Sequence, residues 1–373
     1  MRNTIIICAA LVAAACSTGN APVLIPEENF SETIDGKQVE LCTIRGGELT
    51  LQATNYGCRV VSLWAPDRNG KLEDVVLGYD CLEKYVHNSG ERFLGPTVGP
   101  VANRIANGKF SVDGVEYTLP QNNNGQTLHG GLKGVDLLVW DIVERTDSSL
   151  TMSLCREKGL DGFPGDIHVE VSYTLTSDNR FVISYRADSD EACPLNFSNH
   201  SIFNLKGEGN GTILDHELTI FADATTPVDS VLIPTGEIAP VEGTPFDFRE
   251  AHTIGERIDA DDEQLRNGNG YDHNWVLRRE SEDGVELAAI LYEPASGREM
   301  RVYTDQKGLQ FYAGNFFDGL SSGKYGRTFN FREALALETQ NFPDAVNHEN
   351  FPESIYRPGE EYHQTCIYEF NVR

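Results

Sequence analysis

The chain has 373 residues, and its 57 acidic and 30 basic side chains give a formal net charge of −27. Binding of nucleic-acid phosphates needs clustered lysine and arginine that release counterions, so this balance argues against a nucleic-acid partner and disfavours phosphorylated ligands. The length is sufficient for one large core or for two domains.

The N-terminal segment is typical of a targeting signal. Arg2 precedes an apolar run over residues 5–15 that is too short to span a bilayer. Small residues directly before Cys16 resemble the bacterial lipobox, in which the cysteine is acylated and becomes the new N-terminus. We therefore predict a lipoprotein signal peptide over residues 1–15, lipidation at Cys16 and export to the periplasm or cell envelope. Plain secretion after the pattern Ala13-Ala14-Ala15 is the alternative.

The next segment is predicted to be a tether. Residues 17–26 are rich in Ser, Thr, Gly, Asn and Pro and have little apolar content with which to pack. We assign residues 16–28 to a flexible tether and residues 29–373 to one domain, because no linker-like break or fixed-period repeat follows. The only membrane contact we expect is the N-terminal anchor, and the sequence leaves the oligomeric state unknown.

Periodicity of two dominates the rest of the chain. Residues 49–53, 168–175 and 181–185 alternate as half-buried strands do. Asp113-Gly114 lies between two alternating runs, which predicts a β-hairpin. The best helical stretch, residues 251–258, would be two turns at most and could equally be a loop. The pattern predicts an all-β fold, a large antiparallel sandwich or barrel.

Six cysteines follow Cys16, and none has the spacing of a metal site. In an oxidising compartment they could form disulfides. Several, such as Cys42 and Cys155, lie in apolar strand-like runs where a buried thiol serves as a small hydrophobe. We favour free thiols.

Four polar residues interrupt otherwise apolar or glycine-rich segments. His129 precedes two glycines and is either a ligand-facing residue or a solvated turn histidine. His200 lies between apolar runs and is either a proton donor with a lowered pKa or a core histidine. Glu338 ends an apolar strand and is either a base or a structural partner of Arg104. Asp272, in a glycine-rich loop, could bind sugar hydroxyls or cap its own backbone.

The chain has no His-Glu-x-x-His or Cys-x-x-Cys motif. Acid–base chemistry is what these residues could carry. A metal site built from His129, His200, Glu338 and Asp272 is an alternative, but histidines without short ligand spacing are more often not ligands. We predict no metal.

Taken together and in order, six short motifs resemble the aldose 1-epimerase (galactose mutarotase) family, over residues from about 30 to the C-terminus. They are residues 101–105 (Val-Ala-Asn-Arg-Ile), 127–131 (Thr-Leu-His-Gly-Gly), 199–201 (Asn-His-Ser), 270–274 (Gly-Tyr-Asp-His-Asn), 310–315 (Gln-Phe-Tyr-Ala-Gly-Asn) and 337–341 (Leu-Glu-Thr-Gln-Asn).

The resemblance implies a large antiparallel β-sandwich of the galactose mutarotase type that holds a free aldose such as glucose or galactose in an open cleft. It implies interconversion of the α and β anomers by ring opening and reclosure, in hexose metabolism, without a cofactor. Glu338 would be the general base and His200 the general acid, assisted by His129. The residues expected to bind the sugar hydroxyls are Asn103, Arg104, Asp272 and Gln310.

One position departs from the family pattern. The family commonly has Gly-Arg before its Ala-Asn-Arg segment, whereas this chain has Gly99-Pro100. Proline removes a backbone donor and the guanidinium is lost, which puts the sugar preference near Arg104 in doubt. Two rival functions follow: a non-catalytic sugar-binding lipoprotein with the same fold, and an epimerase of phosphorylated sugars, which the export signal and acidic balance disfavour.

Overall fold

The computed structural model describes residues 21–87 and 90–373. The predicted signal peptide, Cys16 and the first part of the tether lie outside the described residues. The tether boundary predicted at residue 28 is too late, because Ile25 is buried and both its backbone N–H and C=O bond the side chain of Gln52, each at 2.9 Å. No helix in the described part of the chain is long and apolar enough to cross a membrane.

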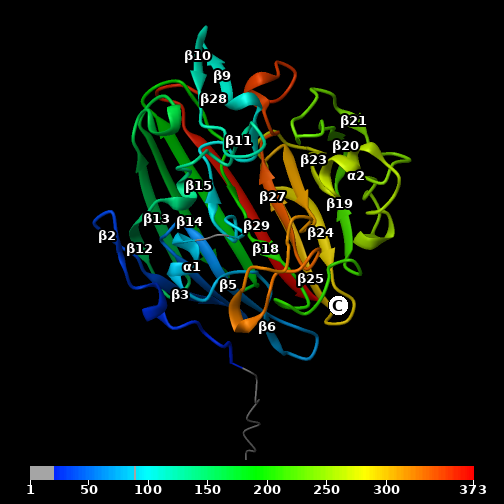
Figure 1. The fold of residues 1–373 in the computed structure, drawn as a ribbon. Coiled ribbons are helices and arrows are strands. Elements are labelled where there is room, and N and C mark those ends of the chain that lie inside the picture. Colours follow the sequence, from blue (N-terminus) through cyan, green and yellow to red (C-terminus); the bar gives the residue numbers. More distant parts are fainter. Residues whose placement is uncertain (1–20, 88–89) are drawn as a thin grey trace, which may run out of the picture.

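The largest element is an antiparallel sheet of nine strands, built from the alternating runs that the sequence predicts and shown in Figure 1. Side chains of β14 alternate between buried and exposed along its whole length. The strands, in their order across the sheet, are β12 (Asp141–Arg145), β13 (Ser149–Arg156), β14 (Ile167–Leu175), β15 (Arg180–Ser189), β29 (Tyr362–Val372), β25 (Arg298–Thr304), β24 (Glu286–Tyr292), β19 (Glu217–Ile220) and β22 (His252–Thr253).

Two further antiparallel sheets have six and four strands. The six-stranded sheet runs β18 (Ile202–Phe203), β27 (Leu335–Gln340), β26 (Gly308–Tyr312), β23 (Asp272–Leu277), β20 (Ala222–Thr226) and β21 (Ala239–Pro240). The four-stranded sheet runs β3 (Leu41–Gly46), β4 (Leu49–Thr54), β5 (Arg59–Pro66) and β6 (Leu72–Asp74).

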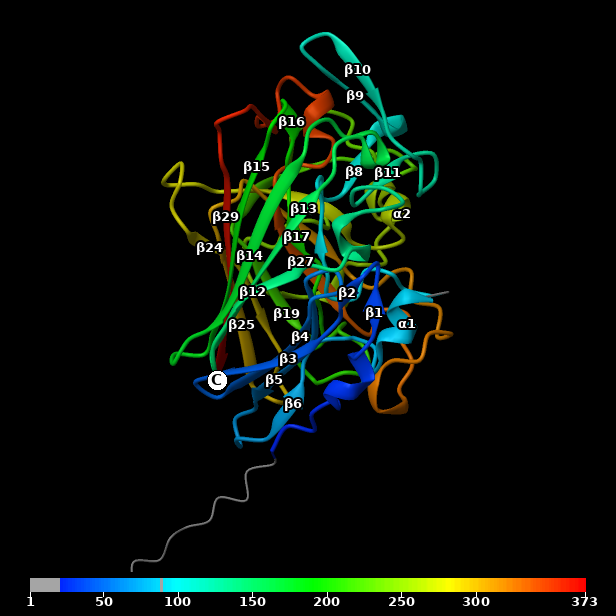
Figure 2. The same cartoon turned by 90° about the vertical axis from the view of Figure 1, so that its left-hand side faces the viewer.

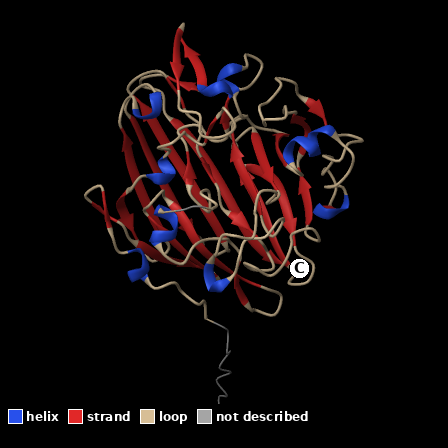
Figure 3. Cartoon of the chain, viewed as in Figure 1, coloured by secondary structure: helices blue, strands red, loops and turns tan. Residues whose placement is uncertain are grey.

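Short strand pairs, α-helices and 3₁₀ turns lie around these sheets, and Figure 3 shows the helical segments in blue. The pairs are β1 (Thr33–Ile34) with β2 (Lys37–Gln38), β7 (Thr97–Val98) with β17 (Ser198–Asn199), β8 (Arg104–Ile105) with β11 (Thr127–Leu128), β9 (Lys109–Val112) with β10 (Val115–Thr118), and β16 (Cys193–Pro194) with β28 (Ile355–Tyr356). The α-helices are α1 (Leu82–Val86) and α2 (Glu263–Gly268).

The sheets enclose one large apolar core. Buried side chains of the nine-stranded sheet pack against those of the other two sheets, and the Tyr368 hydroxyl of β29 donates to the Leu337 carbonyl of β27 at 3.0 Å. Figure 2 shows β14, β15 and β29 on one side of β17 and β27. This layering confirms the predicted all-β antiparallel sandwich.

The local predictions have mixed outcomes. The hairpin is confirmed: β9 and β10 pair around Asp113 and Gly114, whose φ angles of 51° and 82° suit the turn. Residues 251–258, which the sequence leaves open between a helix of two turns at most and a loop, form strand β22 and one 3₁₀ turn over Ile254–Glu256. With a single turn, too few backbone bonds repay the cost of helix nucleation.

All six cysteines after Cys16 are free thiols. Cys42, Cys58, Cys193 and Cys366 are buried, as expected for thiols that act as small hydrophobes. The prediction that Cys155 is buried is wrong. It lies on β13 with its side chain on the solvent face of the alternation, between buried Leu154 and Arg156.

Candidate active site

A polar cleft of about 270 Å³ opens on the six-stranded sheet. It is lined by Glu91, Phe93, Asn103, Arg104, Asn123, Asn124, Leu128, His129, His200, Leu232, Asp272, Tyr312, Phe316 and Glu338. Six of the seven residues predicted for the site are in this set, and the seventh, Gln310, bonds one of them. The structure therefore brings together side chains that are far apart in the sequence.

The floor of the cleft comes from one face of the sheet. Strand register pairs Gln310 of β26 with Glu338 of β27 and with Asn274 of β23, and paired residues share a face. Asp272 lies two residues from Asn274 and so points the same way. The opposite face carries apolar residues of the core, such as Phe311 and Leu337. Alternation along each strand thus separates the core from the site.

Asp272 is not the turn aspartate that composition alone would favour. It is the first residue of β23, is buried, and accepts a hydrogen bond from Gln310 Nε2 at 2.8 Å. Burial raises the pKa of Asp272, while Arg104 and the Gln310 bond oppose this rise. Gln310 therefore orients a carboxyl group whose other oxygen is available to a ligand.

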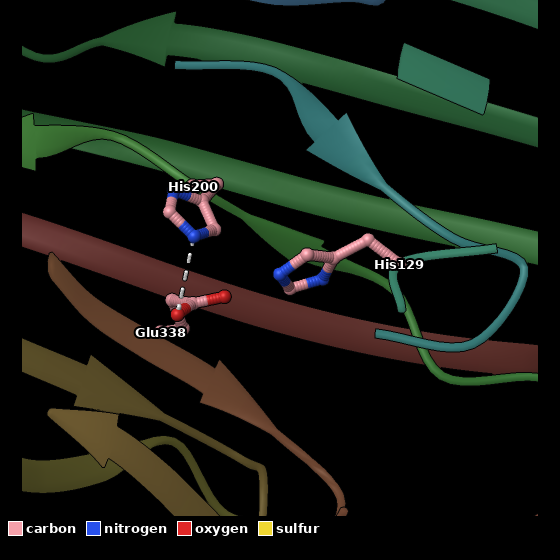
Figure 4. A group of neighbouring side chains, drawn as sticks. All are labelled: His129, His200 and Glu338. Atoms are coloured by element: carbon pink, nitrogen blue, oxygen red, sulfur yellow. Dashed lines mark ion pairs between the residues drawn. The ribbon is translucent and has the colours of Figure 1, made fainter. Parts of the chain in front are cut away.

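His200 and Glu338 form a close buried pair. His200 Nε2 lies 3.6 Å from Glu338 Oε1, and both side chains are almost inaccessible, with 8% and 3% exposure. Figure 4 shows the two facing each other, with the imidazole of His129 pointing toward them. Glu338 Oε2 has no partner in the described part of the chain. Buried polar atoms normally have partners, so this oxygen is poised for a ligand.

The backbone around His200 is fixed by the neighbouring segment. His200 N donates to Pro96 O, and Gly95 N donates to His200 O, both at 2.9 Å. The residue lies between β17 and β18, at a point where the chain changes sheets. Its predicted burial is confirmed.

His129 lies in a tight turn after β11, with a left-handed φ of 50°. Its backbone N–H donates to Asn103 O at 3.0 Å, and Asn103 N donates to His129 Nδ1 at 3.1 Å. Because Nδ1 accepts a hydrogen bond, the neutral ring carries its proton on Nε2. His129 therefore offers a donor, and it is buried rather than solvated.

Arg104 is the cation among the cleft residues. Its backbone N–H donates to Asn103 Oδ1 at 2.9 Å, and its Nη2 donates to Asn123 Oδ1 at 3.2 Å. Burial lowers the pKa of Arg104, and the nearby Asp272 and Glu338 oppose this. Glu338 is paired with His200, so the alternative that it serves as a structural partner of Arg104 is not what the geometry favours.

Burial moves the pKa values of the pair in opposite directions. It lowers the pKa of His200 from 6.5 to about 4. Burial, reinforced by Asp272, raises the pKa of Glu338 well above its usual value, while Arg104 lowers it. Desolvation disfavours whichever form is charged, so burial favours the neutral form of each group. Groups with such shifts are suited to acid–base work.

Three of the four residues considered for a metal site come together. Ligand atoms of His129, His200 and Glu338 lie within 4.8 Å of one another. Asp272 is not in this group, and His129 Nδ1 is already occupied by Asn103 N. The prediction of no metal stays a prediction.

Several cleft residues were missed by the sequence reasoning. Tyr312 follows Gln310 by two positions on β26, so alternation could have placed it on the same face. Phe93, Phe316 and Asn123 come from connections between strands, where periodicity carries no signal. Aromatic rings beside polar groups suit sugar rings, which have apolar faces.

The fold and the cleft define an enzyme of the acid–base class for a small polar ligand. The aldose 1-epimerase family model matches residues 40–369. Galactose mutarotase of Rattus norvegicus is 44% identical over 337 residues, covering 90% of this chain and 95% of the relative. Aldose 1-epimerase of Escherichia coli (strain K12) is 37% identical over 339 residues, covering 90% and 96%.

Solved structures agree. A GalM/aldose epimerase homologue from C. elegans has a TM-score of 0.82 and 31% identity, covering 90% of this chain and 99% of its own. Galactose 1-epimerase from Lactobacillus acidophilus NCFM has a TM-score of 0.78 and 26% identity, covering 91% and 97%. The chain belongs to the aldose 1-epimerase family and is an epimerase with the galactose mutarotase fold.

Proposed function

We propose that the protein interconverts the α and β anomers of a free aldose such as glucose or galactose, with Glu338 as base and His200 as acid. The observation that carries this proposal is the buried pair, 3.6 Å apart, in a polar cleft. The names of the relatives, galactose mutarotase and aldose 1-epimerase, support the same reaction.

Ring opening of a cyclic sugar moves two protons. Ionised Glu338 takes the proton of the anomeric hydroxyl, the bond between C1 and the ring oxygen breaks, and protonated His200 gives its proton to that oxygen. The aldehyde rotates about the C1–C2 bond, and the reverse transfers close the ring on the other face. No electron is transferred, so the reaction requires no redox cofactor. Each positioned transfer is worth roughly 10² to 10⁴ in rate.

The other cleft residues bind and orient the sugar in this proposal. His129 donates from Nε2 toward the ring oxygen, where negative charge develops. Arg104 and Asp272 hold hydroxyls, and Gln310 fixes Asp272 through its 2.8 Å bond. Arg104 also lowers the pKa of Glu338, which favours the ionised form that acts as the base.

Polarimetry on freshly dissolved α-glucose and α-galactose tests the reaction, with the spontaneous rate subtracted. The protein should speed the approach to anomeric equilibrium, and Glu338→Gln should lower kcat by roughly 10² to 10⁴. Glu170→Gln, on the solvent face of β14, is the matched control and should keep full activity. Full activity of Glu338→Gln would overturn the assignment. Binding of sugar by calorimetry without turnover would instead indicate the non-catalytic sugar-binding protein.

We also propose that the protein is exported and anchored through a lipid on Cys16. The support is the sequence of residues 1–16, with an apolar run ending in small residues before a cysteine. Mass spectrometry of the N-terminal peptide should find an acylated Cys16, and Cys16→Ser should release the protein from the membrane fraction. An unmodified N-terminus beginning at or before Cys16 would indicate plain secretion.

A further inference from the structure

A bidentate ion pair lies directly beside the cleft and outside the proposed machinery. Arg92 Nε donates to Asp136 Oδ2 at 2.7 Å, and Arg92 Nη2 donates to Asp136 Oδ1 at 2.8 Å. The Asp136 side chain is fully buried and that of Arg92 is 24% exposed. A carboxylate this deeply buried is costly unless it is paired, and the two parallel bonds fix the plane of the guanidinium.

The same guanidinium also holds the turn that carries His129. Arg92 Nη1 donates to Gly131 O at 3.1 Å, two residues after His129. On the other side of this turn, a Cβ placed on Gly130 would lie 1.9 Å from Gly99 O and 3.0 Å from Pro100 Cδ. The turn is thus held between the chain at Gly99-Pro100 and Arg92, and Pro100 itself has no donor to offer it.

Arg92 also packs against its neighbour Phe93, and the Phe93 ring lies beside both imidazoles. The guanidinium carbon lies 4.9 Å from the centre of the Phe93 ring. The Phe93 ring in turn lies 4.6 Å from that of His129 and 5.8 Å from that of His200, centre to centre. Phe93 is a wall of the cleft, so a shift of this ring would move the histidines against the sugar.

We propose that Arg92 is a positioning residue of the reaction, which orients His129 and His200 through its fork on Asp136, its bond to Gly131 and its contact with Phe93. This inference rests on the proposed function, because the two histidines matter only if they act on the sugar. Arg92 is absent from the cleft lining and acts through other residues. We expect its effect in kcat, since the Arg92 side chain contacts none of the binding groups Arg104, Asp272 and Gln310.

Kinetics by polarimetry test the role. Arg92→Ala should lower kcat by roughly tenfold or more while KM changes by less than about twofold, because misplacement of a catalytic group costs rate rather than binding. Arg92→Lys should be almost as slow, because lysine keeps the charge but cannot form the fork. Arg278→Ala is the matched control: Arg278 uses the same Nε and Nη2 atoms on Asp223, and its loss should leave kcat unchanged.

A second variant tests whether Arg92→Ala is slow only because its folded state is destabilised. The double variant Arg92→Ala, Asp136→Asn removes the buried carboxylate charge that Arg92→Ala alone would leave unpaired, but it still lacks the contacts of Arg92. It should therefore melt close to the wild type and remain slow. A normal kcat in either Arg92→Ala protein, or full activity of Arg92→Lys, would overturn the proposal.

A readout independent of activity separates this proposal from the reaction itself. In ¹⁵N-histidine NMR spectra, His129 of the wild type should show the Nε2–H tautomer that its bond from Asn103 requires. Arg92→Ala should shift these signals toward a mixture of tautomers. Unchanged His129 signals in Arg92→Ala would overturn the positioning role of Arg92 even if kcat fell. If the wild type had no mutarotase activity but Arg92→Ala still shifted these signals, the proposed function would be refuted and the positioning role of Arg92 would be supported.

Discussion

At the scale of single residues, the site holds two ionisable side chains away from water. His200 and Glu338 are both removed from water, and for each the neutral form is favoured by burial. A sugar whose hydroxyl contacts Glu338 Oε2 and whose ring oxygen contacts His200 Nε2 would stabilise the charged arrangement that ring opening needs.

The pH dependence of kcat/KM, which reflects the free enzyme, should report this pair. Below the His200 pKa of about 4, both groups are protonated and Glu338 cannot accept a proton, so the rate falls. At alkaline pH the pair loses its only proton and the acid is gone. Asp272 raises the pKa of Glu338, so Asp272→Asn should move the alkaline limb to lower pH. Polarimetry between acid and alkaline pH measures both limbs, and an unmoved alkaline limb would contradict the coupling.

Burial of His200 should also make stability depend on pH. Its pKa is depressed from 6.5 to about 4, so the unfolded chain binds the extra proton first as pH falls. The contribution of His200 to the free energy of unfolding should therefore fall by about 3 kcal/mol between about pH 6.5 and 4, and the raised pKa of Glu338 acts in the opposite direction. Urea denaturation across this window measures the drop. His200→Gln should reduce the slope, and an unchanged slope would show that another group causes it.

At the scale of elements, strand alternation predicts one part of the site but not the rest. It could predict that Glu338 points away from the apolar neighbours of its strand. It could not predict that β26 lies between β23 and β27, which is what brings Gln310 and Asp272 beside it. Strand order depends on long-range packing that a local pattern does not contain. His129 and Asn103 have positive φ angles, 50° and 62°, which are set by tertiary contacts. For those two, only the resemblance to a family supplied a role.

The turn after β11, which carries His129, should be sensitive to substitution of its glycine. Gly130→Ala places a Cβ 1.9 Å from Gly99 O at a φ of 85°, so the turn must move and take His129 with it. Gly125→Ala is the control, because its φ is 80° and nothing lies within 4 Å of the added Cβ. Positive φ alone costs about 1 kcal/mol, and the clash should add roughly 1–3 kcal/mol. Melting curves and kcat measure both effects. Equal losses in the two variants would mean that the turn can relax.

At the scale of the whole molecule, one apolar core joins sheets whose strands come from all parts of the chain. The sandwich could be predicted from alternation and turn residues. The start of the fold could not, because Ile25 is the one buried side chain among residues 21–29, and its partner Gln52 lies on β4. A lone contact of this kind leaves no periodic signal.

Truncation should locate the true boundary of the fold. A chain that begins at Ala21 keeps Ile25 and should unfold at the same urea concentration as the protein without its signal peptide. A chain that begins at Glu27 loses burial of Ile25 and leaves the fully buried Gln52 without its two bonds, which should cost at least about 2 kcal/mol. Both chains should keep kcat well below their melting temperatures, because Ile25 lies outside the cleft. Equal midpoints would restore the boundary at residue 28. A lower midpoint for the shorter chain means that the fold begins no later than Ile25.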